Sequence, residues 1–300
     1  MVYNVNKYTY RAAYTGEKSM KKIGLIPNAG KDAGLANTRR IAEYLNGRAE
    51  LLLEEKYKTS VINAEYGSLA ALLDGSDCLI VLGGDGTMLQ NAAECARRSL
   101  PVLGINLGRV GFLTEVELDN IEGALDKLLS GDFGVEKRML MRVELIRGGR
   151  SIVCTHALND IVTSKNAGAK LIAIELYTNG ELVNRYTADG LIIATPTGST
   201  GYSISAGGPV IDPQMELYVA TPICAHMLSV RSAVLPPDKE LVVKLDEAYP
   251  DNGAVVSADG DVIGSIRPGD EVRITRSNYR FSMIKTGSYS FYDTVLKKLS

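Results

Sequence analysis

One stretch of this 300-residue chain indicates how the rest is arranged: Asp77-Cys78-Leu79-Ile80-Val81-Leu82-Gly83-Gly84-Asp85-Gly86-Thr87. Its unbroken apolar run, Cys78–Leu82, predicts a central strand of a parallel sheet, buried on both faces. Apolar residues at helical spacing then follow from Met88 to Arg98 and predict a helix. The glycines between strand and helix therefore form a turn whose free backbone N–H groups and helix dipole favour an anion.

Asp85 lies inside this predicted anion site. A carboxylate there repels phosphate unless it binds a metal ion, takes a proton or hydrogen-bonds a hydroxyl group. Glycine turns between strands and helices are also common without any ligand, so the glycines alone leave a structural turn open, and it is the carboxylate that favours function. Neither standard nucleotide fingerprint fits, since no Gly-x4-Gly-Lys-[Ser/Thr] occurs and Gly84-Asp85-Gly86 lacks the third glycine of Gly-x-Gly-x-x-Gly.

Composition places the chain among ordinary globular proteins, with 45% hydrophobic and 23% charged residues and a length typical of two domains. A net charge of -2 and no long Lys/Arg run give no electrostatic case for nucleic acid. No apolar run approaches the ~20 residues that span a bilayer, and residues 1–20 lack a signal-peptide core, so we expect no membrane association and a cytoplasmic location. Four cysteines without a Cys-x-x-Cys pair and two histidines give no metal-ligand set.

Domain organisation follows from how the patterns change along the chain. Residues 1–19 lack periodicity and are expected to be a flexible extension. Strands and helices alternate over residues 20–131, which predicts a parallel α/β domain. Its expected elements include a strand at Lys22–Pro27 and a helix from Ile121 to Leu129, with Asp119 and Glu122 as a capping box and Gly131 as its end.

Beyond Gly131 the turn signals become dense. Gly148-Gly149 and Asn179-Gly180 join strand-like runs, the latter as a strong hairpin signal, and turns such as Asp259-Gly260-Asp261 separate further short strands, so residues 132–280 are predicted to form a β-rich domain. Residues 281–300 are expected to end in a helix and to pack back on the first domain.

A second polar group occurs at Thr195-Pro196-Thr197-Gly198-Ser199-Thr200-Gly201-Tyr202, where an apolar strand runs into hydroxyl groups and glycines. Such a loop is either a plain turn or a ligand site, and the number of donors and acceptors beside glycines favours a ligand. Asn159-Asp160 at the edge of another strand presents a similar choice between ribose binding and a strand-end turn.

These motifs, together with Leu107–Glu115, Ser205–Pro209 and the segment from Pro222 to Arg231, resemble in order and spacing the motifs of the NAD kinases over roughly residues 20 to 300. The Gly-Gly-Asp-Gly loop also occurs in phosphofructokinases and in diacylglycerol and sphingosine kinases. The Thr-Pro-Thr-Gly-Ser-Thr run separates NAD kinases from both.

The resemblance implies an α/β domain and a β-rich domain with NAD between them, and a homodimer or homotetramer in which a neighbouring subunit completes the site. It implies transfer of the γ-phosphoryl group of ATP, with Mg or Mn, to the 2′-hydroxyl of NAD, which Asp85 contacts as the catalytic residue. Phosphate-binding residues would be Gly83, Gly84, Gly86 and Thr87. NAD-binding residues would be Gly86, Asn159, Asp160, Asp189, Thr197, Thr200, Gly201 and Tyr202.

Two positions depart from the family pattern: Asp160 stands where Glu is usual, and Gly201 where Ala is usual. The shorter Asp160 side chain weakens a ribose hydrogen bond or requires a bridging water. Two other functions stay open, a kinase for a sugar phosphate or lipid and a non-catalytic dinucleotide sensor. The sequence also leaves open whether polyphosphate replaces ATP and whether NADH is accepted.

Overall fold

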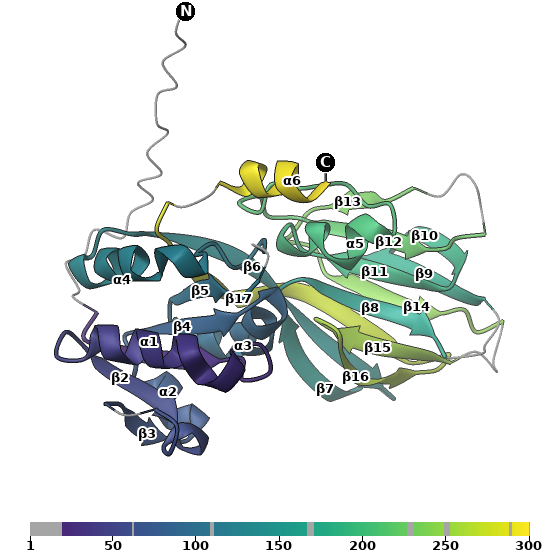
Figure 1. Ribbon diagram of the computed structural model, residues 1–300. Helices are drawn as coiled ribbons and strands as arrows, with labels where there is room; N and C mark the ends of the chain where they lie inside the picture. The colour runs from purple at the N-terminus through teal and green to yellow at the C-terminus, as the bar shows by residue number, and fades with distance from the viewer. Residues whose placement is uncertain are drawn as a thin grey trace, which may run out of the picture. The chain divides into compact units, whose positions relative to one another are not determined.

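The computed structural model describes residues 20–61, 63–108, 111–166, 171–226, 231–248, 253–287 and 290–299. The expected extension over residues 1–19, the pair Arg109-Val110 and the segment Met227–Val230 of the predicted motifs lie outside the described residues. The chain divides into two compact units, whose elements are labelled in Figure 1. The first comprises residues up to Met88, Leu100–Glu136 and residues from Ser282 on; the second comprises Leu89–Ser99 and Lys137–Phe281.

The first unit is built on a parallel sheet with the strand order β17-β5-β4-β1-β2-β3. Its strands are β1 (Lys22–Pro27), β2 (Glu50–Glu54), β3 (Glu65–Gly67), β4 (Cys78–Gly83), β5 (Val102–Asn106) and the last residues of β17 (Glu271–Lys285). Every residue of β4 is buried, which confirms the central strand predicted from its apolar run. An unbroken run suits this place because a strand inside a parallel sheet is covered on both faces.

Helices pack on this sheet through their apolar sides. The helices of the first unit are α1 (Ala36–Leu45), α2 (Leu69–Gly75), α4 (Ile121–Ser130) and α6 (Phe291–Leu299), with short 3-10 turns at η1 (Ala33–Leu35), η2 (Glu55–Tyr57) and η3 (Leu118–Asn120). Ile41 of α1 and Leu125 of α4 share one buried cluster with Ile80 of β4. On the opposite face, a Cβ on Gly24 would lie 2.8 Å from Leu72 Cδ2, so glycine lets α2 approach the sheet.

The start of one helix and the cap of another differ from the sequence prediction. Helix α3 (Asp85–Arg97) begins at Asp85 and not at Met88, because the Gly84 carbonyl already accepts the N–H groups of Thr87 and Met88 at 2.9 and 3.2 Å. The predicted capping box of α4 is wrong: Asn120 precedes the helix without a side-chain capping bond, and Glu122 binds Arg40 of α1 through both oxygens at 2.6 Å. In the part of the chain described, no helix is long and apolar enough to cross a membrane.

The second unit is a pair of antiparallel β layers. One layer contains β10 (Glu181–Ala188), β9 (Ile172–Thr178), β14 (Leu241–Leu245) and β17, with β6 (Gly134–Arg147) paired to β17 and β7 (Arg150–Ala157) paired to β6. The other has the order β13 (Ala233–Leu235), β12 (Tyr218–Ile223), β11 (Gly190–Ala194), β8 (Asp160–Lys165), β15 (Ala254–Ala258) and β16 (Asp261–Ile266). The turn η4 (Thr197–Thr200) and the short helix α5 (Tyr202–Ser205) follow β11.

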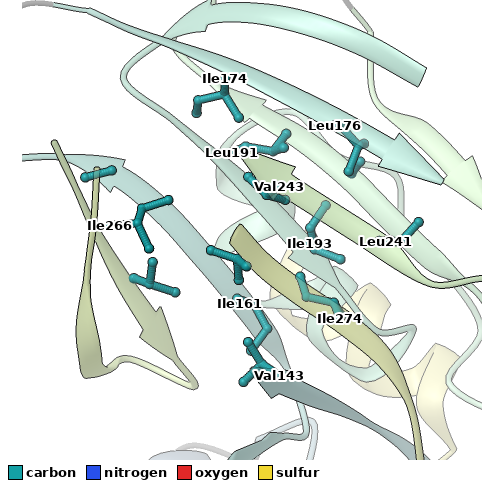
Figure 2. Close-up of a cluster of buried hydrophobic side chains, with 14 of the residues drawn as sticks. Val143, Ile161, Ile174, Leu176, Leu191, Ile193, Leu241, Val243, Ile266 and Ile274 are labelled. Atoms are coloured by element: carbon teal, nitrogen blue, oxygen red, sulfur yellow. The ribbon is translucent and has the colours of Figure 1, made fainter. Parts of the chain in front are cut away.

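One apolar core joins these layers, and Figure 2 shows side chains from both of them gathered together. Ile174 and Val243 come from the first layer, and Ile161 and Ile193 from the second. The predicted hairpin turns are confirmed, with left-handed residues at Gly148-Gly149, Asn179-Gly180 and Asp259-Gly260. The α/β plus β-rich fold class predicted from the sequence is therefore correct.

Candidate functional site

The junction between β4 and α3 is the candidate site of the first unit. Gly83 ends β4, and a Cβ there would lie 2.5 Å from Thr87 Oγ1, so the strand cannot carry a side chain at this point. Thr87 Oγ1 in turn accepts a hydrogen bond from Asn28 Nδ2 at 3.0 Å. A Cβ on Gly86 would meet open space, which leaves the first turn of α3 accessible to a ligand.

The Asp85 carboxylate faces the loop after β5 and binds three consecutive backbone amides. Oδ2 accepts from Phe112 N at 2.8 Å, and Oδ1 accepts from Leu113 N at 3.0 Å and from both N and Oγ1 of Thr114 at 3.3 Å. A Cβ on Gly111 would lie 1.8 Å from Asp85 Oδ1, so only glycine admits the carboxylate at this distance. A carboxylate oxygen has about two lone pairs, and Oδ2 therefore keeps room for a ligand hydroxyl.

Lys31 is a candidate that sequence reasoning missed. Its Nζ lies 3.5 Å from the position that a Cβ on Gly84 would take, which puts an ammonium group beside the predicted phosphate turn. The buried Asp32 orders the adjoining loop by accepting hydrogen bonds from the amides of Asn37 and Thr38 at 3.0 and 2.9 Å. Burial alone would raise the pKa of Asp32, but these bonds and those from both side chains outweigh it and lower the pKa. The sequence signal that could have indicated Lys31 was local, because this lysine follows shortly after Asn28 at the end of β1.

The loop that holds Asp85 is itself held by the C-terminal segment. The ring centroids of Phe112 and Phe291 are 6.0 Å apart, and Lys298 Nζ lies 4.8 Å from the Phe112 ring. The buried Glu115 accepts hydrogen bonds from N and Oγ1 of Thr286 and forms an ion pair with Lys285. Side chains of Lys285, Thr286, Phe291 and Lys298 thus contribute to the surroundings of the loop that binds Asp85.

A pocket in the second unit is a candidate site of its own. It has a volume of about 380 Å³ and is lined by Leu89, Asn159, Asp160, Val162, Ser164, Tyr202, Ser257, Asp259 and Gly260. The structure therefore brings together three of the predicted site residues, Asn159, Asp160 and Tyr202. Asn159 Oδ1 is buried and has no hydrogen-bond partner among the described residues, as expected of an acceptor that awaits a ligand.

Asp160 is the most buried charged group of this pocket, with 6% of its surface exposed. Burial, and after it the negative charge of Asp259, raises the pKa of Asp160 to about 7. Close to neutral pH this carboxyl group is therefore partly protonated and is able to donate a hydrogen bond as well as accept one.

The hydroxyl-rich loop uses most of its hydroxyl groups for its own structure. Thr195 Oγ1 donates to Leu158 O, Ser199 Oγ to Pro196 O and Thr200 Oγ1 to Thr197 O. Thr197 is buried, and its Oγ1 accepts from Arg138 at 3.3 Å.

The glycines of this loop set its distance from Asn159 and Asp160. A Cβ on Gly198 would lie 2.0 Å from Asn159 O, so glycine is needed for the loop to pass this backbone. A Cβ on Gly201 would fit with slight movement, 3.3 Å from Gly198 O and 3.8 Å from Asp160 Oδ2. The glycine at this family alanine position therefore leaves extra room beside Asp160.

Asp189 does not line the pocket. Its carboxylate pairs with Lys165 at 2.6 Å, and its backbone carbonyl accepts from Lys165 N at 2.9 Å. Nor do the described residues contain a group of three or more His, Cys, Asp or Glu side chains that could hold a metal ion.

Comparison with known proteins adds to this geometry. The family model for the ATP-NAD kinase N-terminal domain matches residues 23–133, and that for the ATP-NAD kinase C-terminal domain matches residues 158–286. An NAD kinase of Thermoanaerobacter sp. (strain X514) is 38% identical over 283 residues, covering 94% of this chain and 99% of that protein.

Solved structures agree with these matches. An NAD kinase from Archaeoglobus fulgidus in complex with ATP aligns with a TM-score of 0.69 and 27% identity, over 93% of this chain and 98% of that one. Yeast NADH kinase complexed with NADH has the same fold, with a TM-score of 0.86 and 23% identity over 94% and 88% of the two chains.

A glycine turn carrying a carboxylate at the end of a parallel strand, followed by a β-sandwich with a polar pocket, defines a kinase of small molecules. Within that class, the chain belongs to the NAD kinase family. The family predicted from the sequence is thereby confirmed.

Proposed function

We propose that this chain transfers the γ-phosphoryl group of ATP to the 2′-hydroxyl of the adenosine ribose of NAD and so makes NADP. Relatives that align over nearly the whole chain are named NAD kinase, in agreement with the activity predicted from the sequence. The observation that carries the proposal is the Asp85 carboxylate, held by the amides of residues 112–114 with one oxygen able to accept from a hydroxyl group.

The phosphates of ATP bind, in this proposal, to the turn between β4 and α3. Support comes from the bare backbone at Gly84 and Gly86, from the N-terminal end of α3 and from the neighbouring Lys31 ammonium group. Amides and a cation at this place neutralise the charge that spreads over the transferred phosphoryl group. The solved Archaeoglobus fulgidus relative contains ATP, which agrees with ATP as the donor.

Asp85 acts on the acceptor. Its carboxylate orients the attacking 2′-hydroxyl and accepts its proton, so that the oxygen is positioned in line with the phosphoryl group. We propose that the adenosine half of NAD occupies the pocket of Asn159, Asp160 and Tyr202, where the free Asn159 Oδ1 accepts from the nucleotide. The loop of Thr197, Thr200 and Gly201 passes beside Asn159 and Asp160, whereas Asp189 pairs with Lys165 at the other end of β8.

A divalent ion, Mg or Mn, enters as part of the ATP substrate. The absence of a carboxylate or histidine cluster among the described residues means that their side chains do not form a metal cage of their own. Phosphate oxygens supply the donors that such hard cations prefer, and the ion neutralises phosphate charge when bound.

We also propose a homodimer or homotetramer. Support comes from large apolar side chains exposed on the second unit: Met215 at 52%, Val234 at 56% on the edge strand β13 and Val262 at 70% on the opposite edge strand β16, which contacts with further copies would cover. Sedimentation at assay concentration tests this: a fully active monomer would contradict it.

The deciding experiment is a matrix of donors and acceptors, with ATP or polyphosphate against NAD or NADH, read by formation of NADP or NADPH. Fructose 6-phosphate and diacylglycerol serve as acceptors for the rival kinase functions. We expect NADP from ATP and NAD. Tight NADP binding without release of ADP would instead identify a dinucleotide sensor.

A further inference from the structure

Asp259 connects two segments that are far apart in the sequence. Its carboxylate accepts hydrogen bonds from the backbone amides of Leu158, Asn159 and Asp160, at 2.7, 2.7 and 3.1 Å. Its own amide donates to Asp160 O at 3.0 Å. The turn between β15 and β16 is therefore bonded on both sides to the start of β8, where the two polar residues of the pocket lie.

The turn itself does not require this carboxylate. Asp259 has a left-handed backbone with φ of 49°, followed by Gly260 with φ of 92°, a combination that Asn-Gly forms equally well in a two-residue hairpin. What an aspartate adds is a second acceptor oxygen and a negative charge. Both oxygens are used on the segment 158–160, so the residue type is explained by that segment and not by the hairpin.

The segment that Asp259 holds carries the groups with unused binding capacity. Asn159 Oδ1 is buried without a partner in the described part of the chain, and Asp160 is almost fully buried in the same pocket. On its other side, Asn159 O lies 2.0 Å from where a Cβ on Gly198 would be. Asn159 is thus fixed between the hydroxyl-rich loop and Asp259, and a small displacement would move its amide away from a ligand.

We propose that Asp259 is a positioning residue for the acceptor nucleotide: it holds Asn159 and Asp160 in the geometry in which their side chains bind NAD. This inference rests on the proposed function, because it takes NAD as the ligand of the pocket. Asp259 acts through the backbone of its neighbours and has no part in phosphoryl transfer.

Because Asp259 is charged, its positioning role also affects the pH dependence of NAD affinity, which a purely structural role would leave unchanged. Burial first and the Asp259 charge second raise the pKa of Asp160, while burial, opposed by the three amide bonds, raises that of Asp259. Tyr202 is the other titratable group lining the pocket, and Asp261 acts on Asp259 through its charge. A nucleotide that covers Asp160 buries it further and favours its neutral form, so NAD affinity falls as pH rises through about 7. Without the Asp259 charge, Asp160 ionises at lower pH and the inflection moves down.

The test compares Asp259→Asn with Asp261→Asn, both measured against the unmodified chain. Asparagine keeps the size of the side chain, tolerates the left-handed backbone and retains one acceptor oxygen, but loses the second acceptor and the charge. Asp261→Asn removes the same charge from an exposed residue two positions further along the hairpin, which binds none of the three amides. The measurements are kcat, the KM for NAD and for ATP, and the Kd for NAD by calorimetry, from pH 6 to 9.

We expect Asp259→Asn to raise the KM and Kd for NAD roughly five- to twenty-fold, since it removes a hydrogen bond to a charged acceptor that orders the segment. The KM for ATP and kcat should stay within about twofold. The inflection of NAD affinity should move to lower pH by more than it does in Asp261→Asn. The proposal would be overturned if the NAD affinity and the pH of its inflection did not change. It would also be overturned if Asp259→Asn lowered kcat and raised the KM for ATP as much as it raised the KM for NAD.

Two further measurements keep the outcome decisive. If circular dichroism shows that Asp259→Asn is unfolded, Asp160→Asn in the presence of the native Asp259 should abolish the pH dependence of NAD affinity near neutrality, and its persistence would contradict the proposal. Failure of the proposed function looks different, because the unmodified chain would then form no NADP. If only this inference fails, the unmodified chain forms NADP and the NAD affinity is the same with and without the Asp259 carboxylate.

Discussion

Asp85 in the first unit and Asp259 in the second unit each bind three consecutive backbone amides, those of residues 112–114 and of residues 158–160. A glycine lies close to each arrangement: a Cβ on Gly111 would overlap the Asp85 carboxylate itself, and a Cβ on Gly198 would overlap the backbone of Asn159 in the segment that Asp259 binds. The two regions differ in which group is left for a ligand. At the first it is the carboxylate itself; at the second it is the side chains of the segment being held. The same local arrangement thus serves a reacting group in one unit and a binding pair in the other.

The largest effect is expected for Asp85→Asn. Loss of a general base typically lowers kcat ~10²- to 10⁴-fold, whereas loss of one neutral hydrogen bond costs about ten-fold or less. We expect the purified, folded variant to lie in the first range at saturating NAD and ATP. A kcat above about a tenth of the unmodified value would show that Asp85 is not the base.

A matched control separates charge from loop order in this experiment. Asp85→Asn also disturbs the bond to Phe112 N, whereas Phe291→Ala loosens Phe112 and leaves the carboxylate in place. The kcat of the control, Phe291→Ala, should fall much less than that of Asp85→Asn. Equal losses would assign the effect to the loop.

Asp160→Asn tests the region in the second unit through its effect on the free energy of unfolding. The pKa of Asp160 rises from 3.8 to about 7 on folding, so the folded state binds more protons than the unfolded state between these values. Stability therefore falls as pH rises from about 4 to about 7, and an uncharged asparagine removes this loss, on the order of 3 kcal/mol. Urea unfolding at pH 4.5 and 8.5 should show the variant gaining stability relative to the unmodified chain only at the higher pH. A pH-independent difference would contradict the burial of a titrating Asp160.

Gly111→Ala tests whether the two glycines are equivalent. The new methyl group would overlap a side chain that is able to turn away, so folding should survive while a displaced Asp85 lowers kcat roughly 10- to 100-fold. Gly198→Ala meets backbone atoms and is expected to reduce the melting temperature and NAD affinity instead. Steady-state kinetics and thermal melts of both variants check this, and identical behaviour would remove the distinction between the regions.

The smallest effect is expected for Lys31→Met, which keeps the length of the side chain and removes its charge. The KM for ATP should rise roughly ten-fold with little change in the KM for NAD, because a charged hydrogen bond to phosphate is lost. Lys21→Met, a change of an exposed lysine before β1, is the matched control and should have no effect. An unchanged KM for ATP would remove Lys31 from the donor site.

Patterns confined to neighbouring residues predicted most of the fold. The apolar run of β4 and the Asn179-Gly180 turn needed no partner to be interpreted, since burial on two faces and a left-handed backbone are local requirements. The capping box of α4 was mispredicted because Glu122 binds Arg40 of another helix, 82 residues away in sequence.

The candidate residues that line the pocket, Asn159, Asp160 and Tyr202, came from sequence motifs, whereas a residue whose contacts are distant in sequence was missed. Asp259 looked like an ordinary hairpin residue, because its partners lie about 100 positions earlier in the chain. The hydroxyl groups of Thr195 and Ser199 suggested ligand donors, but they bond to nearby carbonyls. A count of donors does not show which of them the fold has already used.

Phe112 contacts Phe291 and Glu115 contacts Thr286, so partners that are made at very different times during synthesis lie together in the folded chain. A ribosome makes the whole second unit before it makes residues 282–299, although these residues complete the sheet and the loop beside Asp85 in the first unit. Until the last residues of β17 have been made, the edge of β5 in the nascent first unit therefore has no strand to pair with. The loop beside Asp85 should therefore gain its contacts with Phe291 and Thr286 only when the full chain has been released.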